Sequence, residues 1–278
     1  MKNNPFKKIR IKHADWPFLI LFISIYLAAL LVGILIFDGT ELIGWLSFST
    51  VFIILLFLVH LYRTEQQERE FNRYRVQAIN EISSLLNLRA PLPPMAGWAA
   101  TPELAITVLK TIQAEKPDFI VELGSGVTSV ISAYTAENFS QNSTILSFDH
   151  NQNFSEQTRK EIELHGLSSF IKIIHAPLTA RKIDGQEWMW YDMNEKLLKS
   201  NIDLLIIDGP PVKTQKNARY PALPILHPYL SDHAVIILHD SDRQTETETL
   251  NKWTEQFDDI SIKVNLFSEK GITILQKG

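Results

Sequence analysis

The longest hydrophobic stretches of the chain lie near its amino-terminal end. Trp16 to Phe37 is a run of 22 residues without a formal charge, and Leu42 to Tyr62 is a second run of 21 residues. Each run is long enough to cross a hydrocarbon core of about 30 Å as a helix, and a helix satisfies its own backbone hydrogen bonds in lipid. The short acidic link Asp38 to Glu41 favours a tight hairpin. We therefore predict two transmembrane helices over residues 16–62.

Basic residues flank this hairpin and are absent from its link. They lie in the tail of residues 1–15 and, after the second run, at Arg63, Arg69, Arg73 and Arg75. The positive-inside rule then places both ends of the hairpin in the cytoplasm. Three other interpretations stay open at this point: a cleaved signal peptide, a buried soluble hairpin, and one span with the other run in the membrane interface.

The segment Arg63 to Leu88 is charged but carries one apolar stripe at helical spacing. The stripe consists of Phe71, Tyr74, Ala78, Ile82 and Leu85. Such a helix either pairs with a second copy of the chain, giving a homo-oligomer through residues 63–88, or packs on its own domain. Ala90 to Pro94, "APLPP", ends the helix because proline cannot continue it. We take residues 63–94 as a stalk and 95–278 as a separate domain.

Beyond Thr101 the hydrophobic pattern alternates between strands and helices. The predicted strands are Phe119–Leu123, Ser143–His150, Phe170–Leu178, Ile202–Pro211 and His233–Asp242, and a hairpin follows over 260–278 around Glu269-Lys270-Gly271. Predicted helices cover 101–117, 129–137, 155–166, 220–230 and 245–257, with Thr101 and Ser155 as caps and Gly166 as a stop. This order predicts an α/β fold, a doubly wound and mainly parallel sheet with a carboxy-terminal antiparallel hairpin.

Polar groups lie at the carboxyl ends of four of the predicted strands. They are Glu122 with the turn glycines Gly124 and Gly126, then Asp149, then Asp208, then His239 with Asp240. Ligands of open parallel sheets bind at these carboxyl ends, and glycines let the backbone approach a ligand closely. A dinucleotide site would follow G-x-G-x-x-G, but the third position here is Ser129. The pattern E-x-G-x-G therefore disfavours a nicotinamide-dependent oxidoreductase, although that class stays open.

The ordered set of motifs resembles a known family. "VELGSGVTS", "SFDHN", "HAPL", "IDLLIIDGPP", "ARYPALPIL" and "AVIILHDSDR" occur in this order. From about Gly97 to the end, this is similar to class I S-adenosylmethionine-dependent methyltransferases with a Rossmann-like fold, especially a bacterial membrane-anchored group. E-x-G-x-G alone is a weak signal, whereas the ordered set is specific.

The resemblance implies cofactor-binding roles at the first turn. Gly124, Ser125 and Gly126 would wrap the methionine part of S-adenosylmethionine. Glu122 would lie near the ammonium group of the cofactor, which accounts for an acid just before the turn.

Further roles are implied for the later strand ends. Asp149 would accept the ribose hydroxyls, His150 would flank the adenosine, and Ala176 with Pro177 would line the adenine. Asp208 would lie next to the transferred methyl group. The alternative for Glu122 and Asp149 is that they are solvated charges.

Catalytic and metal roles are implied less directly. His239 and Asp208 are candidate bases, with Asp240 beside them. The alternative for His239 is a histidine that is only hydrogen-bonded at the end of its strand. Asp208 and Asp240 also resemble the acids that hold Mg²⁺ in catechol-type O-methyltransferases, and oxygen ligands suit that ion. Ser241 stands where those enzymes carry an asparagine, so the metal stays open.

Two segments outside the motifs carry further candidates. The first, Gly185–Asp192, contains Trp188, Trp190 and Tyr191, which either line an acceptor pocket or pack the segment on the domain. The second follows Asp208 and contains Lys213, Lys216 and Arg219, which either bind an anionic acceptor or belong to a solvated loop.

Together these patterns predict a methyltransferase anchored in the bacterial inner membrane, with both termini and the catalytic domain in the cytoplasm. The expected acceptor is a small molecule or a lipid-linked compound, methylated at oxygen. A net charge of −4 without a basic stripe argues against nucleic acid as a partner. A catalytically silent membrane scaffold with the same fold is the remaining alternative.

Overall fold

The computed structural model describes residues 16–278, except 96, 98, 199–200 and 267. The predicted basic tail, residues 1–15, lies outside the described residues. The chain divides into two compact units, Met1–Glu70 and Phe71–Gly278. The division falls within helix α2 (Gly39–Leu85), and each unit is described by itself. The domain boundary at the proline-rich stretch stays a prediction.

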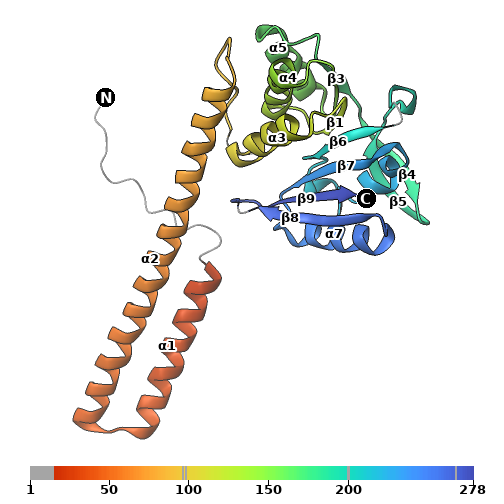
Figure 1. Ribbon diagram of the computed structural model, residues 1–278. Coiled ribbons are helices and arrows are strands. Elements are labelled where there is room, and N and C mark those ends of the chain that lie inside the picture. The colour runs from red at the N-terminus through yellow and green to blue at the C-terminus, as the bar shows by residue number, and fades with distance from the viewer. Residues whose placement is uncertain (1–15, 96, 98, 199–200, 267) are drawn as a thin grey trace. The chain divides into compact units, whose positions relative to one another are not determined.

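The first unit is a pair of helices joined by a short link. Helix α1 spans Trp16–Ile36, and helix α2 begins at Gly39 and continues to Leu85 (Figure 1). The indole Nε1 of Trp45 donates to the carbonyl oxygen of Ala29 at 2.9 Å. Gly33 makes room for this indole, because a Cβ atom at Gly33 would collide with the Trp45 ring. These contacts explain why the two apolar runs form a hairpin.

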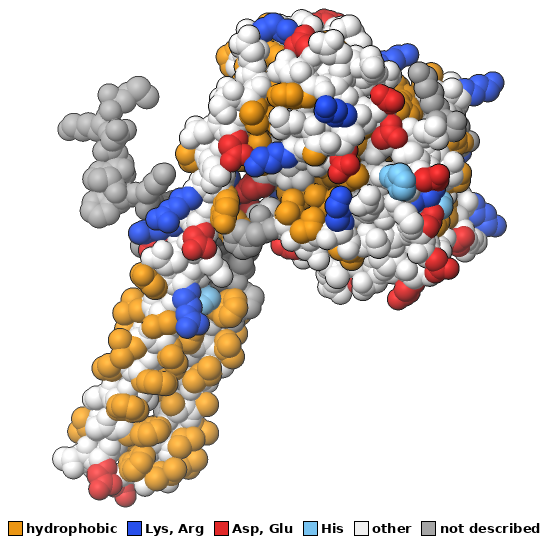
Figure 2. Space-filling view, viewed as in Figure 1, with side chains coloured by type: hydrophobic (Ala, Val, Ile, Leu, Met, Phe, Trp, Pro, Cys, Tyr) orange, Lys and Arg blue, Asp and Glu red, His pale blue; other side chains and the backbone are white. Residues whose placement is uncertain are grey.

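Both helices are long and apolar enough to cross a membrane. Hydrophobic side chains cover the surface of the pair, as Figure 2 shows, and few residues of either apolar run are buried. The predicted stalk is not a separate element, because α2 continues without a break from the second run through Arg63 to Leu85. The helix ends before the prolines, as predicted.

The last turns of α2 belong to the second unit. Ala78 and Ile82 of the stripe are buried, and Ile82 joins a core cluster with Leu86 and residues of the following helices. Tyr74 and Leu85, in contrast, are 53% and 37% exposed. The predicted stripe therefore packs in part on its own domain, and pairing with a second copy stays a prediction.

The second unit is built on a seven-stranded sheet in the order β3-β2-β1-β6-β7-β9-β8 among the described residues (Figure 1). The strands are β1 Phe119–Leu123, β2 Thr144–Asp149, β3 Ile171–His175, β6 Ile202–Ile207, β7 Leu230–His239, β8 Ile260–Leu266 and β9 Ile272–Lys277. The first five in sheet order pair in parallel, and β9 lies antiparallel between β7 and β8. This confirms the predicted mainly parallel sheet with a carboxy-terminal antiparallel hairpin.

Both faces of the sheet are covered, because alternate residues of each strand enter different clusters. On β1, Ile120 packs with helices α3 (Pro102–Glu115), α4 (Val127–Phe139) and α5 (Gln152–Leu164). Val121 packs on the opposite face with α6 (Ala222–Leu226), α7 (Gln244–Gln256) and a separate two-stranded sheet of β4 (Leu178–Ile183) and β5 (Gln186–Tyr191). Continuous apolar strands are expected in a sheet covered on both sides.

Of the three helix-end residues predicted from the sequence, two have the predicted role. The Thr101 side chain accepts from the backbone N–H of Leu104, as predicted for a cap. Gly166 has φ +64 after α5, which fits its predicted role as a stop. The predicted cap Ser155 is wrong, because α5 starts three residues earlier and Asn151 caps it by accepting from Phe154 N–H.

Candidate functional site

A cavity of about 530 Å³ opens within the second unit at the carboxyl ends of β1, β2, β6 and β7. Strand order reverses between β1 and β6, which is where ligands of doubly wound sheets bind. The volume suits a small organic ligand. The sheet order therefore brings the predicted strand-end groups together around one space.

The glycine turn after β1 forms one wall of this cavity. Gly124 has φ +98, and a Cβ atom added there would lie 3.1–3.2 Å from backbone atoms of Asp208 and Gly209. The turn is thus packed against the end of β6, and both features require glycine. Gly126, the N-cap of α4, donates its N–H to the hydroxyl of Ser129 at 3.1 Å. The cavity wall consequently presents backbone atoms at the start of a helix.

Asp149 at the end of β2 holds this turn. Its Oδ2 accepts from the backbone N–H of Ser125 at 3.0 Å and from the Ser125 hydroxyl at 2.8 Å, while Oδ1 accepts from Asn151 N–H at 2.8 Å. The side chain is buried yet lines the cavity. It is therefore not a solvated strand-end charge, and a carboxylate has acceptor capacity for one more donor.

Glu122 lies beneath the turn rather than in the wall of the cavity. It is fully buried, and its Oε2 accepts a 2.5 Å hydrogen bond from Ser129, the same hydroxyl that receives Gly126 N–H. Its Oε1 has no hydrogen-bond partner among the described residues. Burial raises the pKa of Glu122 to about 7. The acid thus supports the turn from the side of α4, and it is not a solvated charge.

This environment gives a pH-dependent stability that Glu122→Gln should remove. The folded protein holds the Glu122 proton more tightly than the unfolded chain, so its contribution is present below about pH 4.5 and is lost as the pH rises through about 7. Wild type should therefore lose about 2–3 kcal/mol more unfolding free energy between pH 5 and pH 8 than Glu122→Gln. Urea unfolding of the full chain in mild detergent, followed by tryptophan fluorescence, measures this difference.

An exposed acid serves as the matched control for that comparison. Glu163 lies on the exposed surface of α5, so Glu163→Gln should keep the wild-type pH dependence. Equal pH dependence in wild type and Glu122→Gln would contradict the buried environment described above.

The remaining residues expected at the adenosine end are not all in the wall. His150 lines the cavity and is half-buried, with its ring edge-on to Tyr191. Burial lowers the pKa of His150, so its neutral form is favoured. Ala176 is fully buried and donates its N–H to the carbonyl of Asp149, while Pro177 is exposed, and neither belongs to the cavity lining.

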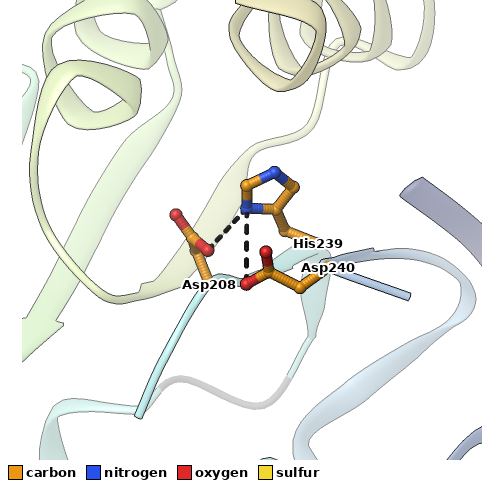
Figure 3. Close-up of side chains that lie close together, drawn as sticks. All are labelled: Asp208, His239 and Asp240. Atoms are coloured by element: carbon orange, nitrogen blue, oxygen red, sulfur yellow. Dashed lines mark hydrogen bonds and ion pairs between the residues drawn. The ribbon is translucent and has the colours of Figure 1, made fainter. Parts of the chain in front are cut away.

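His239, Asp208 and Asp240 meet at the opposite end of the cavity (Figure 3). His239 Nδ1 lies 2.7 Å from Asp208 Oδ1 and 3.9 Å from Asp240 Oδ2. Its Nε2 atom is buried and has no partner among the described residues, and in Figure 3 it points away from both acids. A carboxylate on Nδ1 stabilises the tautomer with its proton there, which leaves the lone pair on Nε2. The arrangement can therefore accept a proton at Nε2.

A buried arginine connects these groups. The guanidinium of Arg219 is 2.7 Å from Asp240 Oδ2 and 3.4 Å from Asp208 Oδ1, and it also donates to the carbonyl of His239 at 2.5 Å. Burial disfavours the charge of Asp208, but His239 and Arg219 hold the pKa of that carboxyl below its ordinary value. The segment after Asp208 carries two further cations. Lys213 lines the cavity, while Lys216 pairs with Glu248 at the surface.

Among the described residues of the segment between β3 and β6, Tyr191 lines the cavity. Trp188 and Trp190 are buried in the core cluster, which confirms packing as their role. Tyr191, on the same strand β5, lines the cavity, and its hydroxyl has no partner among the described residues. Burial raises its pKa well above the ordinary value, so the hydroxyl stays protonated and can donate. Sequence reasoning left this residue undecided between packing and the site.

Comparison with known proteins agrees with these features. Residues 121–241 match a family model described as "Methyltransferase domain". This segment begins within β1 and ends just after β7, so it includes the glycine turn and all the strand-end groups described above. The search of curated proteins found no significant match.

Two solved structures show the same fold at low sequence identity. A candidate O-methyltransferase from Klebsiella pneumoniae is 13% identical, with 76% of this chain and 99% of that chain covered and a TM-score of 0.52. The O-methyltransferase TomG from Streptomyces achromogenes, in complex with S-adenosylmethionine, is 13% identical, with 75% and 98% covered and a TM-score of 0.51. The family match therefore identifies residues 121–241 as similar to a methyltransferase domain, and the solved structures share its fold.

Proposed function

We propose that this protein binds S-adenosylmethionine in the cavity of its second unit and transfers the methyl group to an oxygen atom of a small-molecule or lipid-linked acceptor. The observation that carries this proposal is the cavity itself. It joins the glycine turn, Asp149, Asp208 and His239, which come from four separate strands, at the switch in strand order. The two ends of the cavity carry different groups, because Asp149 comes from β2 and His239 from β7, on opposite sides of β1 and β6.

The wall at the glycine turn fits the cofactor. Gly124 and Gly126 would let the methionine part approach the backbone, and the one remaining acceptor position of Asp149 would take a ribose hydroxyl. His150 would flank the adenosine, and the unpartnered hydroxyl of Tyr191 would donate to the ligand. Glu122 would act by supporting the turn through Ser129, since it lies beneath the turn and outside the cavity lining.

The other end of the cavity supplies a base for an alcohol or phenol. Bound S-adenosylmethionine supplies a methyl group on a positively charged sulfur. His239 Nε2 would remove the proton of the acceptor hydroxyl as the oxygen attacks, and Asp208 would stabilise the imidazolium that results. The cavity would hold both reactants in line. The name of the neighbour TomG as an O-methyltransferase supports oxygen as the target atom.

Anchoring in a bacterial inner membrane is part of the same proposal. Two exposed apolar helices precede the domain, and arginines follow the second apolar run, which favours a cytoplasmic domain. A reporter fused after Gly278 should be active in the cytoplasm. Activity of that reporter only outside the cytoplasm would contradict this topology.

Methyl transfer can be tested with the full chain in mild detergent. With S-adenosylmethionine labelled in its methyl group, we expect label in acceptors of a solubilised bacterial membrane extract, in bonds that behave as ethers or esters of oxygen. Label in a soluble extract alone would indicate a tethered enzyme with a soluble acceptor. Tight cofactor binding without transfer to either extract would favour the silent scaffold.

A further inference from the structure

The strongest unexplained feature of the site is the buried charge of Arg219. The side chain is 3% exposed, and its guanidinium faces three carboxylates. They belong to Asp240 at 2.7 Å, Asp208 at 3.4 Å and Glu246 at 4.0 Å. Such a charge is costly to bury without partners, so its position must serve the groups around it.

Arg219 is held in place by the backbone as well as by the acids. It donates to the carbonyl oxygen of His239 at 2.5 Å and to that of Asp208 at 3.1 Å. The His239 carbonyl lies at the end of β7, and the Asp208 carbonyl lies just after β6. These two strands pair with each other in the sheet. The guanidinium is therefore a fixed part of the strand-end framework and not a side chain that is free to swing away.

Three of the four carboxylate oxygens of Asp208 and Asp240 lie beside a cationic or histidine side chain. Asp240 Oδ2 pairs with Arg219, and Asp240 Oδ1 lies 2.8 Å from the guanidinium of Arg243. Asp208 Oδ1 contacts both Arg219 and His239 Nδ1. Positive or hydrogen-bonding groups thus already occupy the inward face of this acid pair.

Asp208 and Asp240 are also the acids expected to hold Mg²⁺. Their surroundings show whether the site suits that ion. Ligand atoms of Asp208, His239 and Asp240 all lie within 4.8 Å of one another, close enough for one ion. However, Mg²⁺ and Ca²⁺ need several oxygen ligands at about 2.0–2.6 Å. Two of the three candidate ligand groups already bond to Arg219, whose guanidinium does not lose its proton in proteins. The residues present do not fit a divalent ion.

We propose that Arg219 is a built-in cation that replaces a divalent metal ion at this site, so that the protein works without one. Arg219 is a positioning residue: it neutralises Asp208 and Asp240 and fixes Asp208 against His239. The catalytic consequence rests on the proposed methyl transfer, but the exclusion of the metal does not.

Binding of Mn²⁺ tests this directly, with free Mn²⁺ followed by electron paramagnetic resonance. The full chain in mild detergent, with S-adenosylhomocysteine present, should bind no Mn²⁺ at this site with a Kd below about 1 mM. Arg219→Gln should free the two acids and gain a Mn²⁺ site at least about tenfold tighter, and adding Asp240→Asn should remove it. Arg219→Lys keeps a cation and should gain no site, and Arg243→Gln leaves Arg219 in place and should gain none.

The Mn²⁺ titrations either support or contradict the role proposed for Arg219. A Mn²⁺ site in wild type that Asp240→Asn abolishes would overturn it, as would a folded Arg219→Gln that gains no site. If Arg219→Gln fails to fold, the wild-type titration with and without Asp240→Asn still decides. Calorimetry with S-adenosylhomocysteine on the same samples separates the two proposals: absent binding contradicts the proposed function, whereas a wild-type Mn²⁺ site contradicts only the role of Arg219.

Discussion

Gly124→Val is expected to reduce the affinity for S-adenosylhomocysteine at least about a hundredfold and to destabilise the protein by about 3 kcal/mol. The residue has φ +98, which a β-branched side chain rarely adopts. Its added Cβ would also lie 3.1–3.2 Å from backbone atoms of Asp208 and Gly209. Because backbone cannot move as easily as a side chain, the turn must shift away from β6, and the wall of the cavity shifts with it.

Gly185→Val is the matched control for this prediction. Gly185 also has positive φ, +80, but no atom lies within 4 Å of the position of its Cβ. The control should cost about 1–2 kcal/mol from backbone strain alone and leave ligand affinity unchanged. Calorimetric titration and urea unfolding of both variants give the two quantities. A folded Gly124→Val that binds the ligand like wild type would remove the glycine turn from the site.

His239→Gln is expected to slow methyl transfer by about 10²–10⁴-fold while leaving the affinity for S-adenosylhomocysteine within about threefold of wild type. Glutamine keeps a hydrogen-bonding group towards Asp208 but offers no basic nitrogen in place of Nε2. The assay is transfer of labelled methyl groups to the acceptor extract at saturating cofactor, beside calorimetry with the product.

His227→Gln provides the control for the loss of a histidine elsewhere. His227 lies outside the cavity, where its Nε2 pairs with Asp259 at 2.9 Å and its ring stacks on Phe257. Its replacement should leave the transfer rate unchanged. Full transfer activity in His239→Gln would mean that the proton leaves by another route and that His239 is only a structural partner of Asp208.

The parts of the fold that could be predicted are those fixed by local pattern. Strands such as Phe119–Leu123 are apolar runs ended by a glycine or an acid, and their order along the chain dictates the groups at the edge of a parallel sheet. Thr101 and Gly166 could be read for the same reason, since capping depends on neighbours within a few residues.

The β4–β5 hairpin shows a local signal that was missed. Asp184-Gly185 joins the two strands with φ values of +50 and +80, and such a pair between β-prone runs is a strong hairpin signal. Recognising it would have separated Trp188 and Trp190, which face the core, from Tyr191 at the strand end. The cap of α5 was missed because Ser155 and Asn151 are equally suitable cap residues, and only packing decides between them.

The role of Arg219 could not have been predicted from its surroundings in the chain. Its partners lie 11, 21 and 27 positions away, at Asp208, Asp240 and Glu246. Only the parallel pairing of β6 with β7 brings two of these acids to the same edge. Similarly, Glu122 could be expected near the ligand, but its position under the turn depends on the hydroxyl of Ser129 on the next helix.

One measurement tests the central claim, that the cavity at this edge of the sheet binds S-adenosylmethionine. S-adenosylhomocysteine and NAD⁺ are titrated separately into the full chain in mild detergent, with heat as the readout. We predict binding of one S-adenosylhomocysteine per chain and no heat with NAD⁺. Heat with NAD⁺ alone would contradict the account and would instead support a nicotinamide-dependent oxidoreductase.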